Sequence, residues 1–442
     1  MFCVPVMSVP SVITEFLSSL SYFHKPELRH LAHYLTGLLT LMNKTCRGIS
    51  SMVFDSRHPS SLSRFFSRGK WESEEVNSLR LSMEKSRLSD ENPRFGTLIV
   101  DDVFVKKRGK KIPLSSYHYD PTDGTYKWGH KFVSSLLIHK RTKVAVSLKP
   151  YVRKEDCGRW NWEFKSKNEL FKETVREALR AELPLNCVVF DSWYLNRQNC
   201  DFLEENGLNW VSSLKKNTKV RWHGKMLRVD KWYERYGKKM KHKIVKTNPF
   251  NDREEEHRVL EKVMNVFFLG RKAKLVVEDG EGGEVKFYLT NRLEWDAGMV
   301  LTRYRYRWVI ETYHRDLKQH LGLGECEMRT VEAVKHHISS VLMGATLLDR
   351  MVSESGLMEW VESQRSTAMG RKQRSLLIFV VRDFILWILR FVGAEEEKCE
   401  EIFSALHQHL RLEELERVIG GAEFKGEEVK ANVKERRTGG ST

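Results

Sequence analysis

Two short apolar segments constrain the fold most, because each of them ends in an aspartate. Thr97-Leu-Ile-Val is followed by Asp101 and Asp102, and Cys187-Val-Val-Phe is followed by Asp191. Apolar runs of this length that are rich in β-branched residues are typical of buried strands. A carboxylate at a strand end lies at the sheet edge, where α/β proteins form their active sites. Strands also end in aspartate for turn formation, so this pattern alone leaves both interpretations open.

The segments around these aspartates predict a mixed α/β core. Residues 165–183 have a helical pattern that Pro184 closes, which places a helix between the two aspartate-bearing strands. Alternating and β-branched residues indicate additional strands. These strands are expected at 133–138, 144–148 and 210–214.

Both ends of the chain are predicted to be helical. Apolar residues recur with a period near 3.6 between Leu28 and Leu41. Residues 62–70 mix apolar residues with arginine and lysine, which fits either a solvated basic face or a DNA-binding module. Further helices are expected at 330–353 and 375–391, and the polar tail beyond residue 420 is expected to be disordered. Charged residues interrupt the most apolar of these segments, so we expect no membrane span.

The charge of the chain favours a polyanionic partner. Lysine and arginine number 75 against 59 acids, a formal net charge of +16. The excess is concentrated in residues 215–246, which hold thirteen basic residues and two acids with tryptophan and tyrosine among them. Aromatic rings among cations suit phosphate neutralisation together with base stacking. The nucleic-acid-binding candidates in this basic segment are Lys215, Lys216, Lys219, Arg221 and Trp222.

A predicted helix over residues 295–320 carries the most specific pattern. Tyr304, Arg307, Glu311 and Lys318 stand at offsets of 0, 3, 7 and 14. At about 100° per residue they fall on one stripe roughly 60° wide. Such a stripe could be a surface ladder of ion pairs. It could also be a metal-binding carboxylate set among phosphate-binding cations, and this second interpretation accounts for the two strand-end aspartates as well.

These residues resemble the signature of DDE transposases of prokaryotic insertion sequences, in the group with the Y-R-E-K motif (the IS-four superfamily). The spacing Tyr-x2-Arg-x3-Glu-x6-Lys matches completely. The run at 101–107 is similar to a form found in that group, although Val103 replaces the usual threonine and no glycine follows it. Residues 323–329 resemble the continuation of the motif, and the resemblance covers roughly residues 60–350.

The resemblance implies a ribonuclease-H-like catalytic core, interrupted by a β-rich insertion, with a helical N-terminal domain and a helical C-terminal region. It implies that Asp101, Asp191 and Glu311 are catalytic. Asp101 is preferred to Asp102 because the family has an Asp-x-Thr arrangement and because side-chain alternation lets only one of the two face the site. The expected units are 1–96 (helical, binding DNA ends), 97–214 (first part of the core), 215–292 (basic insertion), 293–350 (second part of the core), 351–420 (helical) and 421–442 (tail).

The resemblance also implies a reaction and its partners. The three carboxylates would hold two Mg²⁺ ions, with Mn²⁺ as a substitute, while Tyr304, Arg307 and Lys318 would hold phosphates. A cut-and-paste transposase binds double-stranded DNA, both the terminal inverted repeats of the element and the target, and is expected as a homodimer in the cytoplasm, associated with the nucleoid. The resemblance also implies that an aromatic residue of the insertion stacks a flipped base, and the candidates are Trp295, Phe287 and Tyr288.

Three other interpretations stay open at this stage. The first is a metal-dependent DNA nuclease of the same fold that cuts without inserting. The second is a domesticated DNA-binding protein without catalysis, which would not require all three acids. The third is an RNA-binding protein, which fits the basic segment but leaves the stripe on the helix unexplained.

Overall fold

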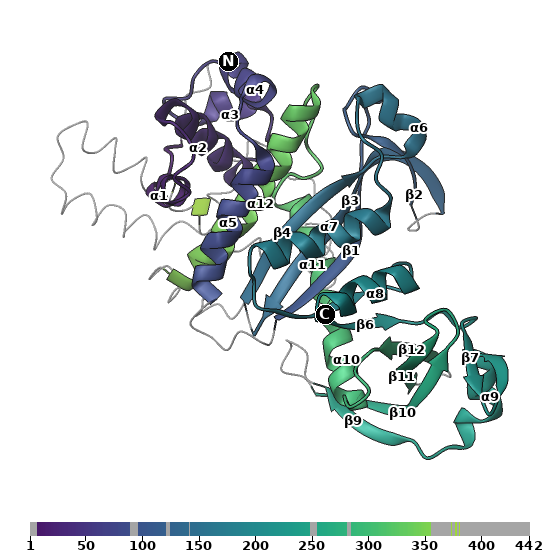
Figure 1. The fold of residues 1–442 in the computed structure, drawn as a ribbon. Coiled ribbons are helices and arrows are strands. Elements are labelled where there is room, and N and C mark those ends of the chain that lie inside the picture. The colour runs from purple at the N-terminus through teal and green to yellow at the C-terminus, as the bar shows by residue number, and fades with distance from the viewer. Residues whose placement is uncertain are drawn as a thin grey trace, which may run out of the picture.

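A computed structural model of the chain describes residues 7–88, 96–120, 124–140, 142–247, 254–280 and 284–354, together with Gln373, Leu376, Leu377 and Val380. These residues form a helical N-terminal region and a mixed α/β region with a large sheet, as Figure 1 shows. The α/β class expected from the sequence is confirmed. The expected C-terminal helix at 375–391 and the tail fall almost entirely outside the described residues.

The N-terminal region packs its helices around one apolar core. Its α2 helix buries the repeating leucines that predict it, among them Leu31, Leu35 and Leu38. The same core includes the long helix α12 (Val331–Glu354), whose His336 ring stacks on Trp71 with a centroid separation of 3.8 Å. The helices are α1 (Ser11–Ser19), α2 (Lys25–Thr40), α3 (Cys46–Met52), α4 (Pro59–Arg68) and α5 (Ser73–Leu88).

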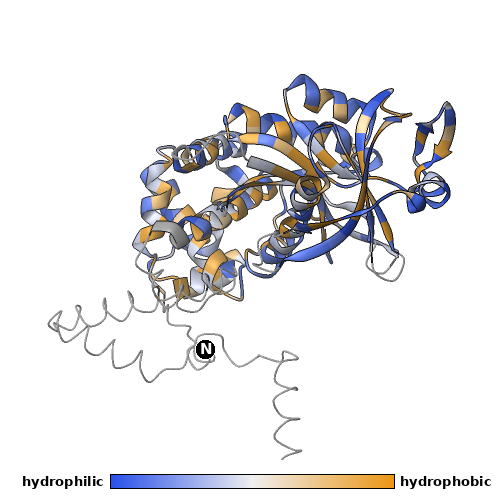
Figure 2. Cartoon of the chain, turned by 90° about the horizontal axis from the view of Figure 1, so that it is seen from below, coloured by the Kyte–Doolittle hydropathy of each residue, from blue (hydrophilic) through white to orange (hydrophobic). Residues whose placement is uncertain are grey.

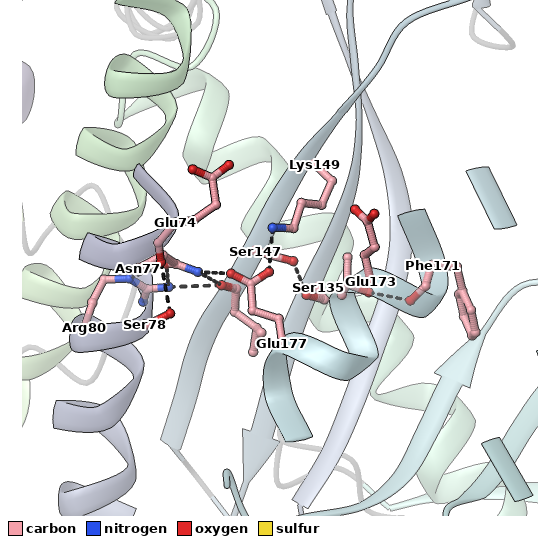
Figure 3. A network of polar contacts seen from close by, with 12 residues as sticks. Glu74, Asn77, Ser78, Arg80, Ser135, Ser147, Lys149, Phe171, Glu173 and Glu177 are labelled. Carbon is pink, nitrogen blue, oxygen red and sulfur yellow. Dashed lines mark hydrogen bonds and ion pairs between the residues drawn. The ribbon is translucent and has the colours of Figure 1, made fainter. Parts of the chain in front are cut away.

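A polar network joins this helical region to the sheet, as Figure 3 shows. Arg80 of α5 is fully buried and donates to the Asn77 Oδ1 atom at 2.6 Å, to the Val146 carbonyl at 3.1 Å and to the Thr346 hydroxyl at 2.7 Å. A buried guanidinium is stable only when its donors are satisfied. The network therefore fixes α5 and α12 against the strand that carries Val146.

The central part of the sheet has a defined strand order. From one side it runs β4, β3, β1, β5 and β6. The pairs β4–β3 and β3–β1 are antiparallel, whereas β1–β5 and β5–β6 are parallel. The strands are β1 (Gly96–Lys106), β2 (Ser116–Asp120), β3 (Thr125–His139), β4 (Thr142–Tyr151), β5 (Leu185–Phe190) and β6 (Asn209–Ser213).

The helices around these strands complete the α/β region. One of them, α8, follows the parallel strand β5, and α11 carries Arg307, Glu311 and Lys318 of the stripe identified in the sequence. Figure 2 shows hydrophobic and hydrophilic residues alternating along the described helices and strands, as expected for elements with one buried side. They are α6 (Lys154–Cys157), η1 (Gly158–Trp160), α7 (Lys167–Arg180), α8 (Arg197–Glu205), α10 (Ala297–Arg305) and α11 (Arg307–Gln319).

The basic β-rich segment continues the same sheet. Its last strand pairs with β6, so the described strands form one twelve-stranded sheet. The longest strand of this segment, β10, pairs with β11 over eight residue pairs. The elements are β7 (Lys219–Trp222), β8 (Lys225–Arg228), α9 (Val229–Arg235), η2 (Gly237–Lys239), β9 (Lys243–Thr247), β10 (Glu255–Val266), β11 (Arg271–Asp279) and β12 (Val285–Thr290).

Among the helices that the structure describes, none combines the length and the apolar composition needed to cross a membrane.

Candidate active site

The two aspartates lie side by side where the parallel pairing of β1 with β5 ends. Asp191 directly follows β5, as expected, but Asp101 lies in the middle of β1, which continues to Lys106, so the expectation that this strand ends at Asp101 is wrong. Strands β1 and β5 are parallel, and Val100 lies opposite Phe190. Asp101 follows Val100 and Asp191 follows Phe190, so the two aspartates occupy equivalent positions on neighbouring chain segments. Neighbouring strands of a sheet lie about 4.8 Å apart. The Asp191 carboxylate also accepts a hydrogen bond from the Trp193 backbone N–H at 3.0 Å, which turns the chain after β5.

Asp101 and Asp102 face opposite sides of the sheet. Asp101 alternates with Ile99 and Val103, which pack in the core that includes α11. Asp102 alternates with Val100 and points to the other side, where Tyr194 and Lys167 bond to its carboxylate. The structure thus places Asp101, and not Asp102, on the side of the Glu311 helix.

The predicted helix over 295–320 is divided in two, and the expectation of one continuous helix is wrong. The break is at Tyr306, whose N–H donates to the Arg303 carbonyl at 3.2 Å in a tighter i to i+3 turn. Tyr304 therefore ends α10, whereas Arg307, Glu311 and Lys318 belong to α11. The stripe is therefore interrupted at Tyr306, although the charges of Arg307, Asp191 and Asp101 still act on the Tyr304 hydroxyl.

Arg307 joins two of the acids. Its Nη2 atom lies 2.9 Å from the Asp101 Oδ2 atom, and its Nη1 atom lies 2.7 Å from the Glu311 Oε1 atom. The side chains of Asp101, Arg307 and Glu311 are 13%, 26% and 40% exposed, so the group opens to solvent at its Glu311 end. The charge of Asp191 acts on both Asp101 and Arg307. Residues from β1, from the end of β5 and from α11 are thus brought together.

Burial makes the Asp101 carboxylate harder to ionise. It raises the pKa of Asp101 to about 6, with smaller contributions from the charges of Asp191 and Asp102 in the same direction. Arg307 and the Asp102 backbone N–H oppose this rise. The negative form of Asp101 therefore depends on a nearby positive charge, which Arg307 supplies in this structure.

A histidine fixes α11 against β1. The buried His314 ring hydrogen bonds to the Ser134 hydroxyl, and that hydroxyl donates to the Asp101 carbonyl at 3.0 Å. Burial lowers the pKa of His314 to about 3, so the ring is neutral near pH 7. The sequence indicated only a core or surface role for this histidine, because nothing in it identifies Ser134 as the partner.

The two remaining residues of the stripe differ in their surroundings. The Tyr304 ring packs on Tyr288 with centroids 4.7 Å apart, and burial raises the pKa of its hydroxyl. Lys318 is exposed, and its charge helps to lower the pKa of His314. Neither residue has a described hydrogen bond to the three acids, so Arg307 makes the direct contact.

The nucleic-acid candidates of the basic segment separate into exposed cations and packed rings. Lys215, Lys216, Lys219 and Arg221 are exposed on the loop after β6 and on β7. Trp222 is half-buried against the buried Trp232 ring, at a centroid distance of 5.6 Å. The three rings considered for base stacking are buried in this structure. They are Phe287, Tyr288 and Trp295.

The donor set fits a divalent metal ion. Carboxylate oxygens are the ligands that Mg²⁺ prefers, and Asp101 and Asp191 are neighbours on adjacent strands. In the described part of the chain, however, no group of three or more potential ligand residues is already clustered for a metal. Arg307 lies between Asp101 and Glu311, so Glu311 would complete the donor set only when this guanidinium releases it.

A family model described as "DDE superfamily endonuclease" matches residues 15–264, which is more than half of the chain. The protein therefore belongs to the DDE superfamily of endonucleases. Membership implies a nuclease or transposase activity in general, and enzymes of this superfamily generally use divalent metal ions. The matched residues include Asp101 and Asp191 and end before Glu311.

The other comparisons add little. A solved structure titled as the piggyBac transposase synaptic complex with hairpin DNA is similar at 14% sequence identity, covering 98% of this chain and 88% of that chain with a TM-score of 0.43. At that TM-score the likeness supports no argument about this protein. No curated protein matches the sequence.

Proposed function

We propose that this protein is a metal-dependent DNA transposase of the Y-R-E-K group of insertion-sequence enzymes. One observation carries the proposal: Asp101, Asp191 and Glu311 come from three separate segments and are gathered around Arg307. A surface ladder of ion pairs would not require a buried aspartate from β1. The motif spacing supports the assignment to this group, because each of its residues is present.

The strand order supports a ribonuclease-H-like core. Three antiparallel strands, β4, β3 and β1, are followed across the sheet by the parallel strands β5 and β6. The first acid lies on the central strand and the second follows its parallel neighbour, as the resemblance implies. In this proposal, residues 97–214 and 293–350 make up the core, 215–292 are an insertion, and 1–96 bind the DNA ends.

The three acids would hold the metal ions. Two bound Mg²⁺ ions would activate the attacking oxygen and stabilise the leaving oxygen, and Mn²⁺ could replace them. The chain itself positions the donors, since β1 and β5 set the two aspartates side by side and His314 fixes α11 against β1. Arg307 keeps Glu311 directed to Asp101 before DNA arrives and can then grip a phosphate with its guanidinium. Tyr304 and Lys318 would contact neighbouring phosphates.

The same site would serve each step of a cut-and-paste reaction. Water would first break a phosphodiester bond at the element end and free a 3′-hydroxyl. That hydroxyl would then attack a phosphodiester of the target, which releases a target 3′-oxygen and joins the two DNAs. The exposed cations Lys215, Lys216 and Lys219 would neutralise backbone phosphates. Two ends must be cut together, which favours a homodimer on DNA.

The test uses DNA that carries the flanks of the gene as substrate. With Mg²⁺ we expect cleavage at the flanks, no cleavage with EDTA, and a rate reduced at least about a thousandfold in Asp191→Asn while DNA binding persists. Glu294→Gln, which changes an exposed acid outside the site, serves as the matched control. Unimpaired cutting by Asp191→Asn would refute the proposed site. A joined target product separates a transposase from a nuclease that only cuts.

A further inference from the structure

A ladder of aromatic side chains lies exposed on the β2–β3 hairpin. Tyr117 lies opposite Trp128, and Tyr119 lies opposite Tyr126, with ring centroids 5.6 Å apart in each pair. Tyr117, Tyr119 and Tyr126 are 42%, 48% and 62% exposed. In Figure 1 the hairpin extends from the sheet beside α6, on the side away from β7–β12. Large exposed aromatic patches of this kind mark binding surfaces.

The ladder lies on the same sheet face as the Asp101 carboxylate. Ser134 of β3 lies directly opposite Asp101, and side chains alternate along a strand, so the even-numbered positions of β3 share that face. Tyr126 and Trp128 are two of these positions, and their cross-strand partners share the face as well. From Ser134 to Tyr126 the strand advances eight residues, at most about 26 Å.

A group of unpaired cations borders the ladder. Arg108, Lys110 and Lys111 are exposed, and none of them forms an ion pair with a described residue. Arg159 connects this basic loop to the ladder, because it donates to the Lys110 carbonyl at 2.7 Å and lies over the Trp128 ring at 5.5 Å. The nearby acid Asp120 is already paired with Lys127 at 2.8 Å. The surface therefore carries exposed cations as well as aromatic rings.

We propose that the basic loop and the aromatic hairpin together bind DNA whose bases are unpaired or unstacked, with the rings stacking on bases and the loop holding phosphates. This inference rests on the proposed function, since it names a second contact for the same substrate. Cross-strand aromatic pairs also stabilise a hairpin, but that role explains neither the open ring faces nor the unpaired cations. If the intervening DNA is duplex, at about 3.4 Å per base step, the contact lies at most roughly eight base steps from the cleaved phosphate.

The first test measures binding of the full chain to a fluorescein-labelled fifteen-nucleotide oligothymidine by anisotropy, without metal. For the double variant Tyr119→Ala/Tyr126→Ala we expect a Kd roughly tenfold or more above that of the unmodified protein. The double variant Tyr119→Phe/Tyr126→Phe should keep the original Kd, because phenylalanine also stacks. Phe267→Ala, which removes a ring that is 64% exposed at the end of β10, is the matched control and should bind normally.

A second test does not depend on the variants folding. Bromodeoxyuridine-containing oligonucleotide is crosslinked to the unmodified protein, and the crosslinked peptides should include residues 116–120 or 125–128. The inference is overturned if the alanine variant binds like Phe267→Ala, or if the crosslinks map only to other segments. Neither measurement requires cleavage, so loss of this inference leaves the Asp191→Asn test of the proposed function unaffected.

Discussion

Asp101 and Asp102 are neighbours on β1, but they face opposite sides of the sheet and have different partners. On one side, Asp101 meets Arg307, whose guanidinium also holds Glu311, and Asp191 lies on the adjacent strand. On the other side, Asp102 is bonded by Tyr194 and Lys167, and the Lys131 ammonium lies 3.9 Å away. Both aspartates are partly buried and both have cationic neighbours, so residue type and burial do not separate them.

The two carboxylates differ in how many partners hold them, and therefore in whether they are available to bind a ligand. The partners of Asp102 come from β3, α7 and the turn after β5, and they use its carboxylate to join those elements. Asp101 is bonded by one cation that must serve a second acid as well. A carboxylate whose charge depends on a shared, displaceable cation is suited to ligand exchange, whereas one bonded from several elements is suited to stabilising the fold.

The largest expected effect is on DNA cleavage, and it tests the comparison of Asp101 with Asp102 directly. Asp101→Asn should reduce metal-dependent DNA cleavage at least about a thousandfold, because it removes a donor oxygen at the proposed site. Asp102→Asn should keep cleavage within about tenfold but lower the melting temperature, because Lys167, only 12% exposed, loses its partner. Cleavage rates and thermal unfolding are measured for both variants. The reverse pattern would assign the catalytic role to Asp102.

A second prediction concerns the shared cation. Without metal, Arg307→Gln leaves the acids uncompensated, so the melting temperature in EDTA should fall, by about 1 °C per kcal/mol lost for a chain of 442 residues. Mg²⁺ should then raise the melting temperature of this variant more than that of the unmodified protein, because the ion replaces the missing charge. Lys318→Gln, on the same helix, is the control. Equal Mg²⁺ effects in all three proteins would argue against a metal at these acids.

A third prediction sharpens the role of the contact between α11 and β1. The pKa of His314 is about 3 in the folded chain, below its usual value near 6.5. Between these values only the unfolded chain binds the proton, so the free energy of unfolding falls as the pH falls, by about 1.4 kcal/mol per pH unit. His314→Gln should reduce the slope of the free energy of unfolding against pH by the contribution of one proton. Urea unfolding between pH 6 and 4 measures it, with the exposed His223→Gln as control.

The smallest expected effect tests which cations approach DNA. Lys215→Gln/Lys216→Gln should lower the slope of log affinity against log salt by roughly 1 to 2, since each lost phosphate contact accounts for about 0.9. The matched pair Lys272→Gln/Lys286→Gln changes two exposed lysines on other strands of the sheet. Titrations of a labelled duplex at several salt concentrations give the slopes. Identical slopes for the two pairs would remove the basic segment from the DNA contacts.

Much of the fold could be predicted because the patterns are local. The strand that carries Asp101, the strand that precedes Asp191, the helix at 165–183 and the leucines of α2 all follow from periodicity and turn residues, although β1 continues beyond Asp101 to Lys106. The break at Tyr306 was not predictable, since the residues on both sides favour a helix. The same applies to β2, whose buried His118 alternates with exposed tyrosines and gives a weak strand signal.

Side-chain exposure in aromatic segments was the least predictable feature. Trp232 and Tyr233 lie among cations in the sequence, which indicated base stacking, but both are buried in the core below β7 and β8. Trp308, in contrast, is 66% exposed although its position beside the stripe suggested packing. Exposure depends on which elements cover a residue, and distant segments supply that cover.

The sequence by itself determined the chemistry available to this protein: the acids that follow two apolar segments, the Tyr-Arg-Glu-Lys spacing and the excess of positive charge. These are properties of residue type and order. Only the tertiary structure decided which aspartate of β1 faces α11, that Arg307 joins it to Glu311, and that His314 fixes the helix through Ser134. The physical reason is that strand pairing and helix packing join residues far apart in the chain, such as Asp101 and Arg307, which are 206 positions apart, a relation that no local pattern encodes.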